Sequence, residues 1–130
     1  MSVPHNRDYR FDVQLREGLA VEAWFYEMTS GGDRFEVKND RRALETGRVY
    51  VEFEEDRGHT GRWTPCGIAT SQADCWIFAL GDPVSCFVGV STARLRKLVE
   101  VAEVREQPYG SCPTRARVVP LRALLGLPPR

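Results

Sequence analysis

The sequence has no long apolar stretch and no excess of charge of either sign. None of its apolar runs approaches the roughly 18–20 residues that a membrane-spanning helix needs, so we expect no membrane partner. Residues 1–10 are polar and lack the apolar core of a signal peptide. These absences predict a soluble protein of the cytoplasm.

Cysteine and histidine are scarce. The cysteines do not form a C-x-x-C pair, so their spacing gives little support to a zinc site, and a cytoplasmic setting argues against disulfides. The only histidines, His5 and His59, lie near no nucleophile elbow, which argues against a serine or cysteine hydrolase. We therefore expect structural free thiols at Cys66, Cys75, Cys86 and Cys112.

The charge balance neither supports nor excludes a nucleic-acid partner. The chain has 18 acidic and 18 basic residues, whereas a dedicated nucleic-acid binder is usually basic overall. Local patches matter more than the total, and arginines concentrate at residues 94–97 and 114–122. A solvated surface explains both clusters equally well.

With 130 residues, of which 42% are hydrophobic, the chain is expected to form one domain with a core of its own. Predicted strands come in adjacent pairs, which favours a mixed α/β sandwich over a doubly wound fold. We assign residues 1–12 to an N-terminal arm, 13–125 to the domain and 126–130 to a tail.

An acidic residue falls on the apolar side of the first predicted helix, residues 13–28. At about 100° per residue, Glu22 lies in the same sector as Leu15, Leu19 and Phe25. A lone buried carboxylate costs several kcal/mol unless it is paired, protonated or bound to a cation. Glu22 therefore requires an explanation.

Alternating residues predict strands at 33–38 and 49–54, joined by one helical turn that ends at Gly47. If the strands form an antiparallel pair, their apolar faces point the same way and Glu36, Lys38 and Glu52 share the opposite face. Such a face is often merely solvated.

Further along, the pattern predicts a short helix at 69–74, capped by Thr70 or Ser71, and buried strands at 75–80 and 86–90. A helix capped by Thr92 is expected to run to about Ala102, followed by a strand at 116–121 and a final helical turn.

Glu36 and Lys38 form an E-x-K pattern with a use in phosphodiester cleavage. The period of a strand directs both side chains the same way. The carboxylate can bind a divalent ion that activates water, and the ammonium group can orient that water or stabilise charge on the phosphate. Mg²⁺ takes few protein oxygens, and Glu22, Glu36 and Glu52 can supply them.

Several stretches together resemble the PD-(D/E)XK nuclease superfamily, and its small phage-type members and Holliday-junction resolvases in particular. They are "GLAVE", "FEVKND", "ETGRVYVEFE", "PCGIATSQADCWIF" and "RVVPL", which span roughly residues 15–122. The resemblance implies a restriction-endonuclease-like α/β fold, a mixed sheet flanked by helices, and a DNA nuclease that uses Mg²⁺, with Mn²⁺ as a substitute. A resolvase-like member would act as a homodimer on branched DNA.

The resemblance also implies roles for single residues. Glu36 matches the metal-binding acid, Lys38 the lysine that positions water, and Glu22 a helical metal ligand. The proline-aspartate half of the signature is missing, so that acid is either Asp33 at the strand entrance or Glu52, which we favour. Lesser candidates for it are Asp40, which can equally cap the following turn, and Asp74. Phosphates are expected to bind at Arg41, Arg42, Arg62, Arg94 and Arg96.

The incomplete signature leaves two alternatives open. One is a catalytically silent DNA-binding or assembly module on the same fold. The other is a metal-free structural protein in which an arginine pairs with Glu22 and the hairpin face is simply wet.

Overall fold

Two sheets build the body of the protein in this computed structural model, which describes residues 16, 19, 20, 22, 23, 34–108 and 110–130. By their internal contacts the residues divide into two units, Met1–Asp33 and Arg34–Arg130. The second is an α/β unit with one mixed and one antiparallel sheet, which confirms the predicted class. The predicted domain boundaries stay a prediction.

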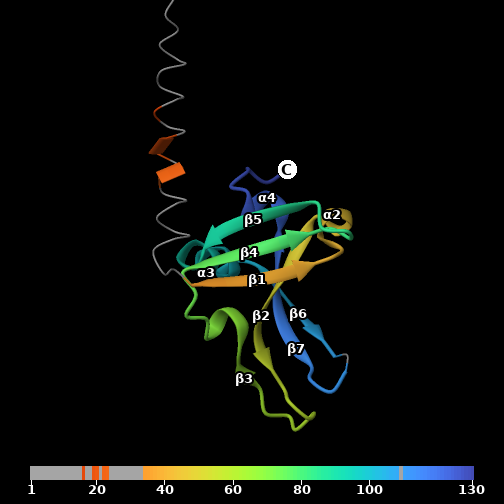
Figure 1. Ribbon diagram of the computed structural model, residues 1–130. Helices are drawn as coiled ribbons and strands as arrows, with labels where there is room; N and C mark the ends of the chain where they lie inside the picture. Colours follow the sequence, from red (N-terminus) through yellow and green to blue (C-terminus); the bar gives the residue numbers. More distant parts are fainter. Residues whose placement is uncertain (1–15, 17–18, 21, 24–33, 109) are drawn as a thin grey trace, which may run out of the picture. The chain divides into compact units, whose positions relative to one another are not determined.

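The mixed sheet has the strand order β1-β4-β5 (Figure 1). Strand β1 (Phe35–Asp40) runs parallel to β4 (Cys75–Leu80), and β4 pairs antiparallel with β5 (Cys86–Ser91). The β4–β5 connection contains a turn with a cis peptide bond between Asp82 and Pro83. Strand β1 is therefore an edge strand of this sheet.

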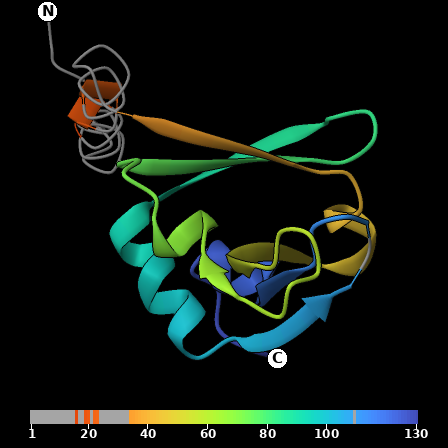
Figure 2. The same cartoon turned by 90° about the horizontal axis from the view of Figure 1, so that it is seen from below.

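The antiparallel sheet has the order β3-β2-β7-β6. It consists of β2 (Arg48–Glu55), β3 (Thr64–Pro65), β6 (Glu103–Gln107) and β7 (Thr114–Pro120). Its strands run steeply across those of the mixed sheet in Figure 1, and Figure 2 shows the two sheets as separate layers. This arrangement is the expected sandwich.

The core lies between the layers. Large side chains of β4, Trp76, Phe78 and Leu80, pack with Val49 and Val51 of β2. Helix α3 (Thr92–Glu100) adds Leu95 and Val99 from its apolar side. Helix α4 (Leu121–Leu124) adds Leu124. No helix in the described part of the chain is long and apolar enough to cross a membrane.

The predicted hairpin is wrong. Helix α2 (Ala43–Thr46) and the left-handed Gly47 follow β1 as expected, but β1 pairs with β4 and β2 pairs with β7 and β3. Alternation along a strand identifies its two faces and carries no information about its partner. Burial of Trp76 and Phe78 decides the pairing instead.

The predicted faces of β1 are reversed as well. Val37 is 62% exposed, whereas Glu36 and Lys38 are half-buried. Glu36 is in register with Trp76 and Lys38 with Phe78, and paired positions in a sheet direct their side chains to the same face. Both polar side chains therefore point toward the layer that contains β2.

Other local expectations were met only in part. No helix forms at 70–74, where only the 3₁₀ turn η1 (Gly67–Ala69) precedes β4. Strand β5 forms, yet Phe87 is 68% exposed. Ser91, and not Thr92, caps α3 by accepting a hydrogen bond from the Arg94 amide, because the Thr92 hydroxyl donates to the Ala73 carbonyl at 2.6 Å.

In the unit Met1–Asp33, the described residues are helical, as predicted: Arg16, Leu19, Ala20, Glu22 and Ala23. The burial expected for Glu22 and Leu19 is not observed, because both are exposed. The period of a helix predicts which residues share a side, and packing partners decide whether that side is covered. Leu15 and Phe25 lie outside the described residues.

Candidate functional site

The E-x-K residues lie side by side on the edge strand β1. The Lys38 ammonium is 2.9 Å from a Glu36 carboxylate oxygen, with the two side chains 43% and 40% exposed. The same ammonium lies 5.5 Å from the centre of the Trp76 ring. The extended strand directs both side chains to one face, as expected, and there they form an ion pair that is accessible to solvent.

Two neighbouring cavities share Lys38, Glu52 and Gly67 in their walls. The first cavity, of about 630 Å³, adds Glu36, Glu55 and Arg57. The second cavity, of about 430 Å³, adds residues from the end of β1 and from the antiparallel sheet, among them Asp40, Arg41, Arg42, Tyr50 and Gln107. We call the two together the Lys38 groove.

Glu52 lies in the groove because η1 packs against the backbone of β2. Gly67 has a φ of +53°, and a Cβ atom there would meet the Glu52 carbonyl group, with the carbonyl carbon only 2.9 Å away. The Cys66 amide donates to the Phe53 carbonyl at 3.0 Å, and the ladder of β2 shifts register between Glu52 and Glu54. The "PCGI" segment thus holds the strand where Glu52 projects.

Acidic side chains lie beside the Cys66 thiol in the wall of the first cavity. Burial, followed by the charges of Glu55 and Glu52, raises the pKa of the Cys66 thiol to about 11. The Cys112 thiol donates to Glu55 at 3.6 Å, and its pKa is also raised, first by burial and then by that hydrogen bond. Cys66, Cys86 and Cys112 carry free thiols, as expected, although Cys86 is exposed where we expected a buried thiol.

The structure brings together only part of the predicted metal set. Glu36 and Glu52 line the first cavity, Glu22 belongs to the unit Met1–Asp33, and Asp33 lies outside the described residues. Among the residues that the structure describes, no group of three or more Asp, Glu, His or Cys side chains is placed to hold a metal ion. Glu36 is moreover engaged by Lys38.

The lesser acidic candidates have structural contacts. Asp40 lines the second cavity and accepts a hydrogen bond from the Arg42 amide at 3.3 Å. This bond stabilises the turn that follows β1, which is the structural role expected for Asp40 as an alternative to metal binding. Asp74 accepts from the Arg34 amide at 3.0 Å and lines neither cavity of the groove. Its carboxylate joins the starts of β1 and β4.

The predicted phosphate-binding arginines are divided. Arg41 and Arg42 line the second cavity. Arg62 and Arg94 line neither cavity, and Arg96 donates to the Ser71 carbonyl at 2.7 Å, which ties α3 to the loop before β4.

Residues that the sequence did not single out complete the groove. Arg57 is held by Glu55 at 2.7 Å, and Arg34 donates to Gln72 at 3.3 Å; both arginines line the first cavity. Tyr50 lines the second cavity and accepts a hydrogen bond from Arg105 of β6 at 3.0 Å. In the sequence, Tyr50 alternates with the apolar residues of β2. This alternation predicts the side of the strand on which Tyr50 lies, but it does not predict which residues surround the ring.

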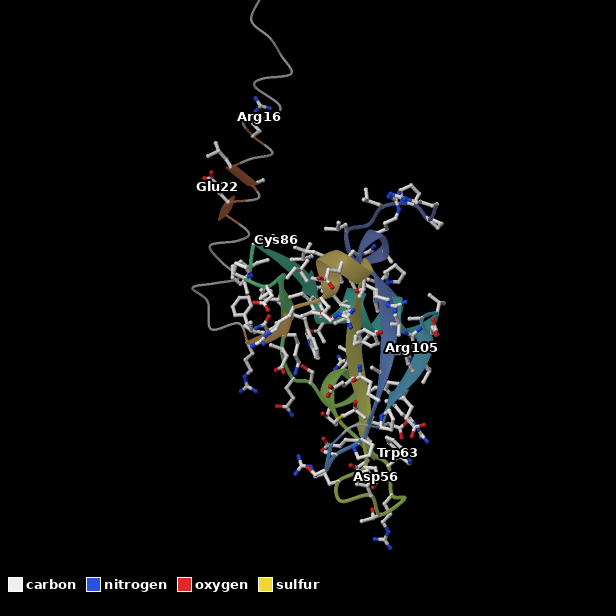
Figure 3. The ribbon with its side chains drawn as sticks, turned by 90° about the vertical axis from the view of Figure 1, so that its right-hand side faces the viewer. Arg16, Glu22, Asp56, Trp63, Cys86 and Arg105 are labelled. Carbon is white, nitrogen blue, oxygen red and sulfur yellow. The ribbon has the colours of Figure 1, made fainter. Side chains whose placement is uncertain are left out.

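The loop after β2 is organised by a buried acid. Asp56 is 5% exposed, and its carboxylate accepts hydrogen bonds from the Thr60 amide, the Thr60 hydroxyl and the Gly61 amide at 2.9–3.0 Å. Burial acts to raise the pKa of Asp56, but the bonds from Gly61 and Thr60 outweigh it and lower the pKa. Figure 3 shows Asp56 with Trp63 at the end of this hairpin, where Arg115 lies 3.8 Å from the Trp63 ring centre.

Comparison with known proteins identifies no relative. The chain matches no protein-family model, no curated protein and no solved structure.

Proposed function

We propose that the protein is a DNA nuclease that hydrolyses phosphodiester bonds in the Lys38 groove. One observation carries the proposal: Glu36, Lys38 and Glu52 line a single accessible cavity. A phosphodiester is an anion that gains charge as water attacks it, and a fixed ammonium group stabilises that charge. The nuclease-like resemblance of the sequence supports the same reaction.

Each residue of the cavity has a role that its contacts allow. Lys38, oriented by Glu36 at 2.9 Å, donates to a non-bridging oxygen of the phosphate. Glu52 is an exposed carboxylate and can accept a proton from the attacking water. Arg57 and Arg34 at one end, and Arg41 and Arg42 at the other, supply charges that hold neighbouring phosphates.

Mg²⁺ or Mn²⁺ is part of this proposal through the resemblance alone. The described carboxylates do not make a metal site by themselves, because the one nearest the lysine is paired with it and the described residues supply no three-ligand group.

The test is cleavage of linear, single-stranded, flapped and four-way DNA, with Mg²⁺ and with chelator. We expect metal-dependent cutting that is lost in Glu36→Ala and Lys38→Ala while thermal unfolding is unchanged. Undiminished cutting by either variant contradicts the assignment. Preference for the four-way junction, together with a dimeric mass in solution, would support the resolvase-like homodimer.

A second candidate is a catalytically silent DNA-binding or assembly module. The engagement of Glu36 by Lys38 favours it, as does the lack of a three-ligand group among the described residues. Calorimetric titration with Mn²⁺ separates the candidates: the nuclease binds the ion and loses it in Glu52→Gln, whereas the silent module binds DNA without binding Mn²⁺.

A further inference from the structure

The Lys38 groove has an aromatic wall on one side of its central lysine. Tyr50 is half-buried and lines the second cavity together with Lys38, Arg41 and Arg42. A cavity of about 430 Å³ lies in the range of small-ligand sites, roughly 300–1,000 Å³. It can therefore receive a group of the size of a nucleotide base, and not the side of a double helix.

Contacts from β6, which lies beyond β7 in the same sheet, and from β2 itself hold the Tyr50 ring in place. The Arg105 guanidinium donates to the Tyr50 hydroxyl at 3.0 Å and lies 5.9 Å from the ring centre. Glu103 fixes the same guanidinium at 3.0 Å, and Arg48 lies 5.9 Å from the ring centre. A ring held by its hydroxyl and flanked by cations is a positioned stacking surface beside a phosphate-attracting field.

Charges along the groove alternate in a way that suits one strand of phosphates. Arginines outnumber acids at both ends, with Arg34 and Arg57 beside Glu55 in the first cavity and Arg41 and Arg42 beside Asp40 in the second. Glu36 and Glu52 lie with Lys38 between them. The arginines at the ends of the groove attract a polyanionic strand. At the centre of the groove, Lys38 is the cation among the acids Glu36 and Glu52. The phosphate next to Lys38 is therefore the one that the groove can hold at its centre.

From these features we infer that the groove binds an unpaired nucleic-acid strand, with a base stacked on Tyr50 and the adjacent phosphate at Lys38. A base within a duplex is already stacked on its neighbours and cannot stack on a ring in a cavity wall, so duplex DNA must be frayed or flapped to enter. This inference rests on the proposed function, since it names the substrate class of the same site.

The experiment measures binding of the full chain to fluorescein-labelled oligonucleotides by anisotropy, in chelator so that no strand is cut. The probes are a single strand, a blunt duplex of the same sequence and that duplex with a single-stranded flap. The single strand and the flapped duplex are expected to bind at least tenfold more tightly than the blunt duplex. Equal affinity for all three probes overturns the inference.

Variants of Tyr50 test the stacking. Tyr50→Ala and Tyr50→Leu should weaken single-strand binding at least fivefold, whereas Tyr50→Phe, which keeps the ring, should remain within about twofold of the wild type. Tyr50→Leu retains apolar bulk if the alanine variant fails to fold. Phe87→Ala, which removes an aromatic ring that is 68% exposed on β5, is the matched control and should bind normally.

The outcomes separate the two proposals. Metal-dependent cutting of blunt duplex with unchanged binding in the Tyr50 variants overturns the single-strand inference and leaves the nuclease intact. Failure to bind any of the three probes in chelator overturns the single-strand inference, and the cleavage assay with Mg²⁺ then decides on the nuclease by itself.

Discussion

The Lys38 ammonium lies 2.9 Å from the Glu36 carboxylate, two positions back on the same edge strand. Both side chains are about 40% exposed, and ion pairs in such settings contribute only about 0–1 kcal/mol. The pair therefore adds little to stability. Its effect is to hold a cation at the centre of the groove, where Glu52 lines the same two cavities.

Lys38→Ala should leave the fold nearly unchanged, with a loss in the free energy of unfolding below about 1 kcal/mol, and should abolish cleavage. Lys38→Arg keeps the charge but changes its geometry, so we expect weak residual cutting. Urea unfolding and a gel assay on the same preparations test this. A large loss of stability in Lys38→Ala would show that the residue is structural.

Gly67→Ala should be more harmful than Gly47→Ala, although both glycines have positive φ, +53° and +72°. A methyl group at Gly67 meets the Glu52 carbonyl group, whereas nothing lies within 4 Å of one at Gly47. Backbone strain alone costs about 1–2 kcal/mol, and at Gly67 the clash adds to it. Chemical unfolding measures the difference, and equal losses would contradict the close approach of η1 to β2.

Removal of the Asp56 charge should destabilise the protein in a pH-dependent way. The pKa of Asp56 is lowered from its ordinary 3.8, so its stabilisation is complete above that value and is lost as the pH falls through the folded-state pKa. The difference in unfolding temperature between wild type and Asp56→Asn should therefore be largest near neutral pH and shrink below about pH 4. Glu100→Gln, an exposed change at the end of α3, should show no such trend.

The Cys66 thiol should resist alkylation at pH 8. With a pKa of about 11, roughly one molecule in a thousand carries the reactive thiolate there. The exposed Cys86 should label first, as peptide mapping by mass spectrometry can follow.

Glu52→Gln should accelerate labelling of Cys66, because it removes one of the charges that raise the pKa of the thiol. Arg122→Gln, on α4 and hydrogen-bonded to the Pro128 carbonyl, is a remote control and should leave the rate unchanged. Equal labelling of Cys66 and Cys86 in the wild type would contradict the raised pKa of the Cys66 thiol.

The strands with clear alternation or an apolar run were predictable: β1, β2, β4 and β7 form close to where the pattern places them. Strand β6 was missed because "EVREQ" has one apolar residue, and its pairing with β7 supplies what its own sequence lacks. The expected helix at 69–74 does not form. The Ser71 hydroxyl accepts hydrogen bonds from the Ala73 amide and the Trp76 indole, and these bonds stabilise a turn in its place.

The candidate site was predictable in its central residues and not in its surroundings. The E-x-K spacing alone requires Glu36 and Lys38 to share a face. Arg57, Tyr50 and Arg105 come from segments that approach β1 only in the folded chain, and no local pattern distinguishes them from other surface residues.

By itself, the sequence determined the class of the fold, the positions of most strands and the adjacency of an acid and a lysine on one strand, because these depend on the period of the backbone and on local apolar content. Only the tertiary structure decided that this polar face points inward toward β2 and that β1 joins β4. Burial of Trp76 and Phe78 between the layers contributes more than burial of Val37 would. Strand β1 therefore turns Glu36 and Lys38 inward, where they line the groove.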